Sequence, residues 1–231
     1  MAASHHTPND LPTDRPEDQP VEAAHATPDE SHEDIVNEHA KPADKSPAPP
    51  PRVFVAGSLS IRQLDSRVRA RIENIVAQRL EIVVGDAEGV DTAAQRVLLE
   101  MPQARVTVFC TGTPRNNLGG WRVESVESEH QVGSRAYFTA KDRRLAEVAD
   151  FGLMIWDCRS TGTLGNILEL LARGKKTVVF VHRLRDFRIV ANPEQLRELT
   201  ELMSDPARRK AEEKIQLSER LAALRQGRMF E

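Results

Sequence analysis

Apolar and polar positions follow two different patterns along residues 53–181. Five short apolar runs carry no charge, which is typical of strands buried on both faces; they are residues 53–56, 82–84, 106–110, 151–156 and 177–181. Between them apolar residues recur every three or four positions, as at Leu64, Val68, Ile72 and Ile75, which predicts amphipathic helices. Strands that alternate with helices indicate an α/β fold with a parallel sheet of about five strands and helices on both faces.

The most informative stretch runs over residues 149–169, where a buried strand, a polar turn and a helix start follow one another. The turn holds Asp157, Ser160, Gly162 and Thr163. A helix N-terminus leaves several N–H groups without an acceptor, and the helix dipole favours negative charge there. Two interpretations have equal weight: Ser160 and Thr163 only cap the helix, or the turn binds a phosphate or carboxylate.

Two further loops with glycine follow predicted strands. Gly57 leaves room for a ligand to approach, and Ser58 could donate its hydroxyl to that ligand, although a plain turn explains both residues equally well. The loop over residues 85–91 follows the second strand. Its last residue, Asp91, is placed to be the N-cap of a helix predicted over about residues 92–100. Loops at the carboxyl ends of parallel strands converge on one crevice.

Acidic side chains limit what the loop over residues 85–91 can bind. Asp86 and Glu88 would repel a bare polyphosphate, so they suit ribose hydroxyls better, with Gly85 and Gly89 giving the loop room to turn. These charges leave room for Mg²⁺, although nothing in the sequence requires it. The same residues might instead only satisfy the turn.

A long polar loop over residues 111–121 precedes a helix predicted over about residues 134–148. Loops of this length inside a compact domain are usually functional or mobile. On the helix, Lys141 or Arg135 could reach a ligand phosphate. The alternative is a solvated helix face with internal charge pairs, which we favour for Arg143 and Arg144.

Composition divides the chain into three parts. Residues 1–51 hold ten of the fourteen prolines and eleven acidic against three basic residues, which predicts a disordered acidic tail. Residues 52–183 form the α/β domain, and residues 184–231 a helical extension whose few apolar positions pack on the domain or on a second subunit of a homo-oligomer. Basic residues of the extension, such as Lys210 and Arg220, alternate with acids, so we expect a solvated helix rather than a nucleic-acid surface.

Cysteine usage and hydropathy restrict the cellular setting. Cys110 and Cys158 are the only cysteines, too few for a zinc site or a disulfide framework, and they fit a reducing cytoplasm. No apolar run approaches the length of a membrane span, and the acidic N-terminus is unlike a signal or transit peptide.

Four motifs in this order resemble the SLOG superfamily, and within it the YspA-like branch: Ala56-Gly57-Ser58, residues 84–91, Lys141-Asp142, and Trp156-Asp157 with residues 160–163. The superfamily includes the LOG phosphoribohydrolases, the DNA-processing protein DprA and sensor domains for nucleotide-derived signals. The resemblance covers roughly residues 52–182. It implies a Rossmann-like fold that binds a nucleotide or a nucleotide derivative.

The resemblance also implies roles for single residues. Gly57 and Ser58 would line the first loop; Gly85, Gly89 and Asp91 the second; and Ser160, Gly162 and Thr163 the phosphate turn. The LOG enzymes carry a catalytic glutamate three residues after this turn, where the present chain has Asn166, and an arginine roughly where Lys141 stands. An asparagine cannot act as a general base, which argues against hydrolysis of the LOG type.

Three functions follow from these observations. The first is binding of a nucleotide or nucleotide-derived ligand, as a sensor or carrier. The second is hydrolysis of an N-glycosidic bond in a nucleotide or nucleoside, with Asp157 or Glu169, or else Asp86 or Asp91, in place of the missing glutamate. The third is single-stranded DNA binding similar to that of DprA. The single tyrosine and the interleaved acids count against the third.

Overall fold

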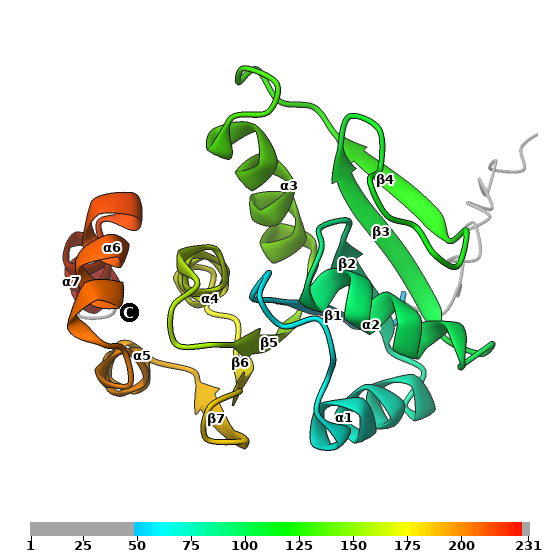
Figure 1. Ribbon diagram of the computed structural model, residues 1–231, viewed down its shortest axis with the longest axis horizontal. Helices are drawn as coiled ribbons and strands as arrows, with labels where there is room; N and C mark the ends of the chain where they lie inside the picture. Colours follow the sequence, from blue (N-terminus) through cyan, green and yellow to red (C-terminus); the bar gives the residue numbers. More distant parts are fainter. Residues whose placement is uncertain (1–48, 228–231) are drawn as a thin grey trace, which may run out of the picture. The chain divides into compact units, whose positions relative to one another are not determined.

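Residues 49–227 are described by a computed structural model. Their seven strands form one sheet in the order β4-β3-β2-β1-β5-β6-β7 (Figure 1). The strands are β1 (Arg52–Gly57), β2 (Glu81–Gly85), β3 (Arg105–Thr111), β4 (Arg122–Val126), β5 (Phe151–Trp156), β6 (Thr177–Val181) and β7 (Asp186–Val190). Neighbouring strands are parallel except β7, which pairs antiparallel with β6.

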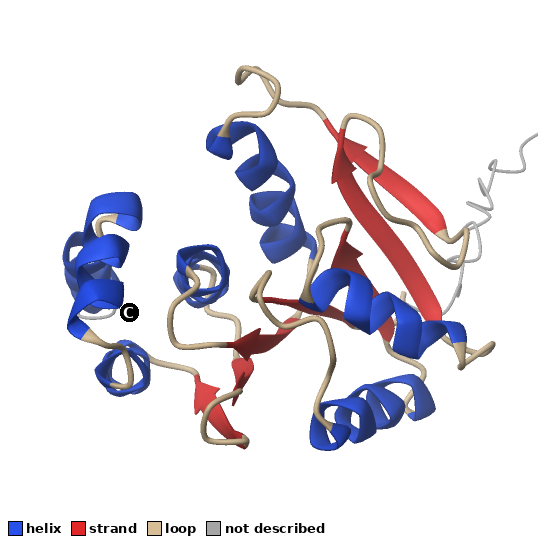
Figure 2. Ribbon diagram, viewed as in Figure 1, coloured by secondary structure: helices blue, strands red, loops and turns tan. Residues whose placement is uncertain are grey.

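Seven helices connect or follow these strands within the described part of the chain (Figure 2). They are α1 (Ser66–Ala77), α2 (Val90–Leu99), α3 (Arg135–Val148), α4 (Thr161–Ala172), α5 (Pro193–Glu201), α6 (Asp205–Ile215) and α7 (Leu217–Gly227). Residues of α1 and α2 join one core cluster, and residues of α3 to α7 join another. The sheet therefore has helices on both faces.

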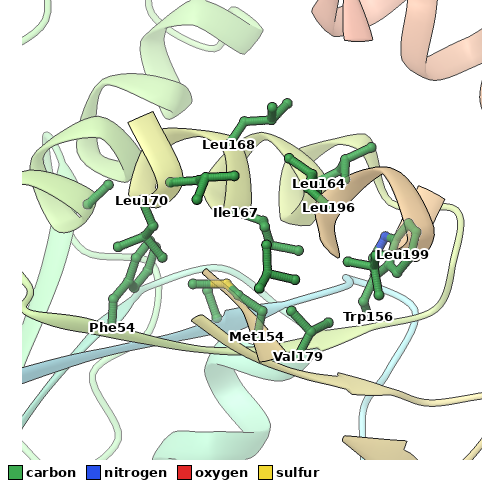
Figure 3. Close-up of a cluster of buried hydrophobic side chains, with 14 of the residues drawn as sticks. Phe54, Met154, Trp156, Leu164, Ile167, Leu168, Leu170, Val179, Leu196 and Leu199 are labelled. Atoms are coloured by element: carbon green, nitrogen blue, oxygen red, sulfur yellow. The ribbon is translucent and has the colours of Figure 1, made fainter. Parts of the chain in front are cut away.

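Successive side chains along each strand point to opposite faces of the sheet. In β1, Val53 and Val55 belong to the cluster under α1 and α2, whereas Phe54 belongs to the cluster under α3 and α4. Figure 3 shows the second cluster, with Ile167 of α4 above Met154 and Val179 of the sheet. Two apolar layers on a mostly parallel sheet explain why its strands read as uninterrupted apolar runs.

The predicted α/β class, with helices on both faces of a Rossmann-like sheet, is confirmed. All five predicted strands are present, and β5 and β6 have the predicted bounds. The sheet also contains β4 and β7, two edge strands that the apolar pattern did not reveal. Among residues 49–227, no helix is long and apolar enough to cross a bilayer.

The sequence predicted a disordered tail at the N-terminal end of the chain and a helical extension at the C-terminal end. The acidic tail, residues 1–51, lies outside the described residues except for its last three. In the predicted extension, β7 continues the sheet beyond residue 183, and the apolar sides of α5 and α6 join the core through Leu196, Leu199 and Ala211. Those apolar positions are therefore covered by their own domain. Assembly of two subunits through these helices stays a prediction.

Candidate functional site

A cleft of about 1350 Å³ opens at the carboxyl ends of β1 and β5. These strands are neighbours, and the chain runs from β1 to one side of the sheet and from β5 to the other, so they mark the point where the strand order reverses. Open α/β sheets bind ligands at this point. The cleft is also lined by residues of α3, α4, α6 and α7. Figure 1 shows where these four helices lie.

The β5–α4 loop is shaped by the carboxylate of Asp157. Its Oδ1 accepts hydrogen bonds from the N–H groups of Arg159 (2.9 Å) and Ser160 (2.7 Å), and its Oδ2 accepts one from the Ser60 hydroxyl (2.8 Å). Cys158, which lies between Asp157 and Arg159, has a positive φ of 63°, and this left-handed backbone permits the tight turn at some conformational cost. Burial acts to raise the pKa of Asp157, but the hydrogen bonds outweigh it and lower that pKa. Asp157 is thus an ionised acceptor that fixes the loop.

The N-terminus of α4 opens into the cleft. The Ser160 hydroxyl accepts a hydrogen bond from the N–H of Thr163 (3.3 Å), which makes Ser160 the N-cap. The N–H groups of Thr161 and Gly162 have no acceptor within residues 49–227. The guanidinium of Arg135, on α3, lies 3.5 Å from the Thr161 hydroxyl. Two free donors, a helix dipole and a nearby cation therefore coincide here.

One side of α4 forms the floor of the cleft, with Gly162, Gly165, Asn166 and Glu169 at helical spacing. Asn166 is only 8% exposed, and its side-chain amide has no partner in the described part of the chain. The carboxylate of Glu169 accepts hydrogen bonds from Arg173 (2.6 Å) and from Arg220 of α7 (2.7 Å). Although burial opposes the charge on Glu169, these two guanidiniums lower its pKa.

A buried group of charges lies beside this floor. Asp86 is bound by the guanidinium of Arg115 at 2.7 and 3.0 Å. The ammonium of Lys141, which is 4% exposed, lies 2.9 Å from Asp142 and 3.8 Å from Asp86. Burial acts against its charge, but the neighbouring carboxylates outweigh burial and raise the pKa of Lys141. The solvated helix face considered for Lys141 is therefore wrong, because its acidic partners hold it inside.

Asp91 is the carboxylate of this group whose negative charge is least stabilised by its neighbours. Its Oδ2 accepts one hydrogen bond, from the N–H of Ala87 (3.2 Å). Burial raises its pKa to about 7, although Lys141 acts in the opposite direction. Asp91 is not the N-cap that its position suggested: Gly89, with a φ of 75°, precedes the first helical residue, Val90. The carboxylate instead closes the loop from inside the first turn.

Nine of the predicted site residues line the cleft: Gly57, Asp91, Lys141, Asp157, Ser160, Gly162, Thr163, Asn166 and Glu169. Four do not: Ser58, Gly85, Asp86 and Gly89. Ser58 is fully buried, and its hydroxyl accepts a hydrogen bond from the N–H of Asp157 (3.1 Å) rather than facing a ligand. A Cβ on Gly85 would lie 2.3 Å from an oxygen of Asp91, so this glycine makes room for the buried charges.

Several cleft residues were missed in the sequence. Arg159 and Gly165 sit next to predicted site residues, but neither residue type signals a site alone. Lys210, Lys214 and Arg220 belong to α6 and α7, and Gln216 joins these two helices; all four lie far from the motifs along the sequence. In total, eight Lys or Arg and four Asp or Glu residues line the cleft, so it favours an anion. Among residues 49–227, no three His, Cys, Asp or Glu side chains are grouped to hold a metal ion.

No family model matches the sequence, and no curated protein matches it. A comparison of the structure with solved structures does find similar folds. The fold is similar to that of DprA. The protein from Helicobacter pylori, studied for its single-stranded DNA binding, is 20% identical with a TM-score of 0.46, over 60% of this chain and 68% of that one. DprA from Streptococcus pneumoniae is 22% identical with a TM-score of 0.43, over 56% of this chain and 50% of that one.

At these identities and scores the likeness concerns the fold alone. Membership of the SLOG superfamily, and of its YspA-like branch, therefore stays a prediction.

Proposed function

We propose that the protein binds a nucleotide or a nucleotide derivative, with a phosphate at the N-terminus of α4. The observation that carries the proposal is the pair of unbonded N–H groups of Thr161 and Gly162, which open into the cleft beside Arg135. Backbone donors at a helix N-terminus bind phosphate oxygens, and a guanidinium adds charge-assisted hydrogen bonds. Arg159, exposed at the same mouth, is a second cation within the lining.

The unpaired amide of Asn166 supports a ligand with more than a phosphate. The amide has no partner among residues 49–227 and is not one of the enclosed unpaired polar atoms, so a ligand in the cleft can reach it. An amide supplies both donors and an acceptor, which matches ribose hydroxyls or the edge of a base. Phe138 and Leu59 add apolar surface to the lining. The cleft also exceeds the size that a bare phosphate needs.

The experiment is calorimetric titration of the full-length protein with AMP, ADP, NAD⁺, inorganic phosphate and adenosine. A short single-stranded oligonucleotide tests the DNA-binding alternative in the same series. We expect a phosphorylated ligand to bind, adenosine to bind much more weakly, and Arg135→Ala and Arg159→Ala to reduce affinity by about fivefold each. Arg96→Ala is the control, because Arg96 is exposed on α2 and does not line the cleft.

Equal binding of AMP and adenosine would show that the phosphate is not recognised. Absence of binding to every ligand in the series would end the proposal. Tight binding of the oligonucleotide alone, with steep salt dependence, would favour the third function instead.

One observation supports N-glycosidic hydrolysis as a second candidate. Asp91 lines the cleft and has a pKa raised by burial to about 7, so it can hold and release a proton at neutral pH. Asp157 and Glu169 fit this role poorly, because hydrogen bonds lower the pKa of both. Release of a free base from the nucleotide series, lost in Asp91→Asn, is the expected sign of this reaction. No base release at high protein concentration would exclude it.

A further inference from the structure

A second group of cations lies at the far end of the cleft, on the corner between α6 and α7. Lys210, Lys214 and Arg220 line the same cleft as the N-terminus of α4. Arg220 is held by Glu169, and Lys214 pairs only with its exposed neighbour Glu213 (2.9 Å). None of the ion pairs among the described residues includes Lys210. Two lysine ammoniums are thus available to an incoming anion.

This corner is fixed by its own contacts. The carboxylate of Glu212 accepts hydrogen bonds from the N–H (3.0 Å) and hydroxyl (2.9 Å) of Ser218, which join the end of α6 to the start of α7. Gln216 between the helices has a φ of 52°, a left-handed backbone that turns the chain sharply. The bond from Arg220 to Glu169 (2.7 Å) ties α7 to α4. The lysines of α6 are therefore presented on an ordered wall.

The floor between the two cationic ends is unusually open. A Cβ on Gly165 would meet no atom within 4 Å, and one on Gly162 would meet only the Ser160 hydroxyl, at 3.9 Å. Glycine is unfavourable inside a helix, and packing does not require it at Gly165. From Gly162 to Glu169 the helix rises by about 10 Å, with the free amide of Asn166 between them. This length suits a nucleoside lying along the helix.

We infer that the α6–α7 corner holds a second phosphate, so that the ligand is a nucleotide with one phosphate on each side of its nucleoside. The inference rests on the proposed function for the first phosphate. The first phosphate meets the N–H groups of Thr161 and Gly162. The nucleoside passes over Gly165, and the ammoniums of Lys210 and Lys214 meet the second phosphate. Adenosine 3′,5′-bisphosphate is the simplest compound of this class.

The test compares AMP with adenosine 3′,5′-bisphosphate by calorimetric titration of the full-length protein. We expect the bisphosphate to bind about tenfold more tightly or better, because it gains charge-assisted hydrogen bonds. In Lys210→Ala/Lys214→Ala this advantage should shrink to about twofold, with AMP affinity unchanged. Arg209→Ala is the matched control, since Arg209 is exposed on the same helix outside the cleft and should keep the full advantage.

The outcomes separate this inference from the proposed function. Equal affinities for AMP and the bisphosphate would overturn the inference and leave the first phosphate site in place. An advantage that persists in the double lysine variant would also overturn it, because the second phosphate would then bind elsewhere. Failure of both compounds to bind would overturn the proposed function and this inference together. Both lysines are exposed, so their removal should leave the thermal unfolding midpoint unchanged.

Discussion

Two loops at the same edge of the sheet contain the same kinds of residue and behave differently. The β2–α2 loop, residues 86–89, and the β5–α4 loop, residues 157–160, each follow a buried parallel strand and begin with an aspartate; a glycine follows in each case, Gly89 at the end of the first loop and Gly162 in the first turn of α4. In the first, Asp86 is bound by Arg115, and the space beside Gly85 is filled by Asp91 and Lys141. In the second, Asp157 holds the loop open at the start of α4.

The difference is whether the polar groups of a loop already have partners inside the protein. The groups of the β2–α2 loop and its neighbours are paired with each other, so they mainly stabilise one wall of the cleft. Past the β5–α4 loop, two N–H groups of α4 have no acceptor among the described residues, so they remain available to a ligand. Glycine and aspartate at a strand end therefore indicate only a tight turn. Whether the loop supports the fold or binds a ligand depends on whether its N–H donors already have acceptors inside the protein.

The strongest test of this comparison removes the ammonium at the centre of the buried charges. In Lys141→Met, Asp86, Asp91 and Asp142 lose a shared counterion, and we expect the free energy of unfolding to fall by about 3 kcal/mol or more. Urea denaturation measures the change. Arg144→Met on the same helix is the control: the Arg144 side chain is 43% exposed, so solvent screens its ion pairs with Glu124 and Glu147, and the cost should stay below about 1 kcal/mol. Equal losses in the two variants would contradict a special role for Lys141.

The next effect concerns the pH dependence of stability through Asp91. Its pKa is raised from 3.8 to about 7, so between these values the folded protein keeps a proton that the unfolded chain releases. The contribution of Asp91 to the free energy of unfolding therefore falls by on the order of 4 kcal/mol as pH rises through this window, and it is level above the window. Urea denaturation at a series of pH values should show this slope in the wild type.

Asp91→Asn is the matched variant for the pH series, because it keeps the shape of the side chain and cannot titrate. The difference in stability between wild type and variant isolates Asp91, since Asp86, Asp157 and Glu169, whose pKa values are lowered, are present in both proteins. A difference that is constant from pH 4 to 7 would show that Asp91 is charged throughout.

A smaller effect separates stability from binding at α4. Gly165→Leu places a side chain over the floor of the cleft without clashing at Cβ, so we expect nucleotide affinity to fall by about tenfold or more. The same change should raise the free energy of unfolding by about 0.5–1 kcal/mol, because leucine is a better helix former than glycine. Calorimetric titration and urea denaturation measure the two quantities. Gly165→Ala is the control, with a similar gain in stability and a smaller loss of affinity; unchanged affinity in Gly165→Leu would place the ligand elsewhere.

The smallest expected effect compares two helix caps. Ser160 caps α4 and Ser134 caps α3, each by accepting one backbone N–H, so either change to alanine should lower the free energy of unfolding by about 1 kcal/mol. Only Ser160 lines the cleft, and we expect Ser160→Ala alone to weaken phosphate binding, by about threefold. Parallel denaturation and titration of the two variants check this, and an equal loss of affinity in both would contradict it.

The sheet was largely predictable because its central strands are buried on both faces. Their side chains are uniformly apolar, so each strand stands out in the sequence. The edge strands β4 and β7 have sequences RVESV and DFRIV, in which charges interrupt the apolar positions. Edge strands need only one protected side, and charge there also discourages pairing with other chains. Such strands leave little signal in hydropathy alone.

The candidate site was predictable only where it is local in sequence. Ser160, Gly162 and Thr163 follow one strand directly, and the strand and turn together predicted a helix N-terminus. The burial of Lys141 depends on Asp86, which is far away along the chain, and no periodicity reveals such a pair. The same holds for Arg220: the helical pattern identifies the apolar side of α7, but not that its polar side meets Glu169.

The contact between Arg220 and Glu169 also bears on the order in which the cleft is completed during synthesis. Strands β1 to β6 and α4 precede residue 182, whereas the wall with Lys210 and Arg220 comes from residues 205–227. Because a chain emerges from the ribosome N-terminal end first, the sheet and the α4 N-terminus can form while the cleft still lacks that wall. A nascent chain at that stage would lack the core residues of α5 to α7 as well as part of its binding surface, so the complete cleft forms only when these last helices pack on α4.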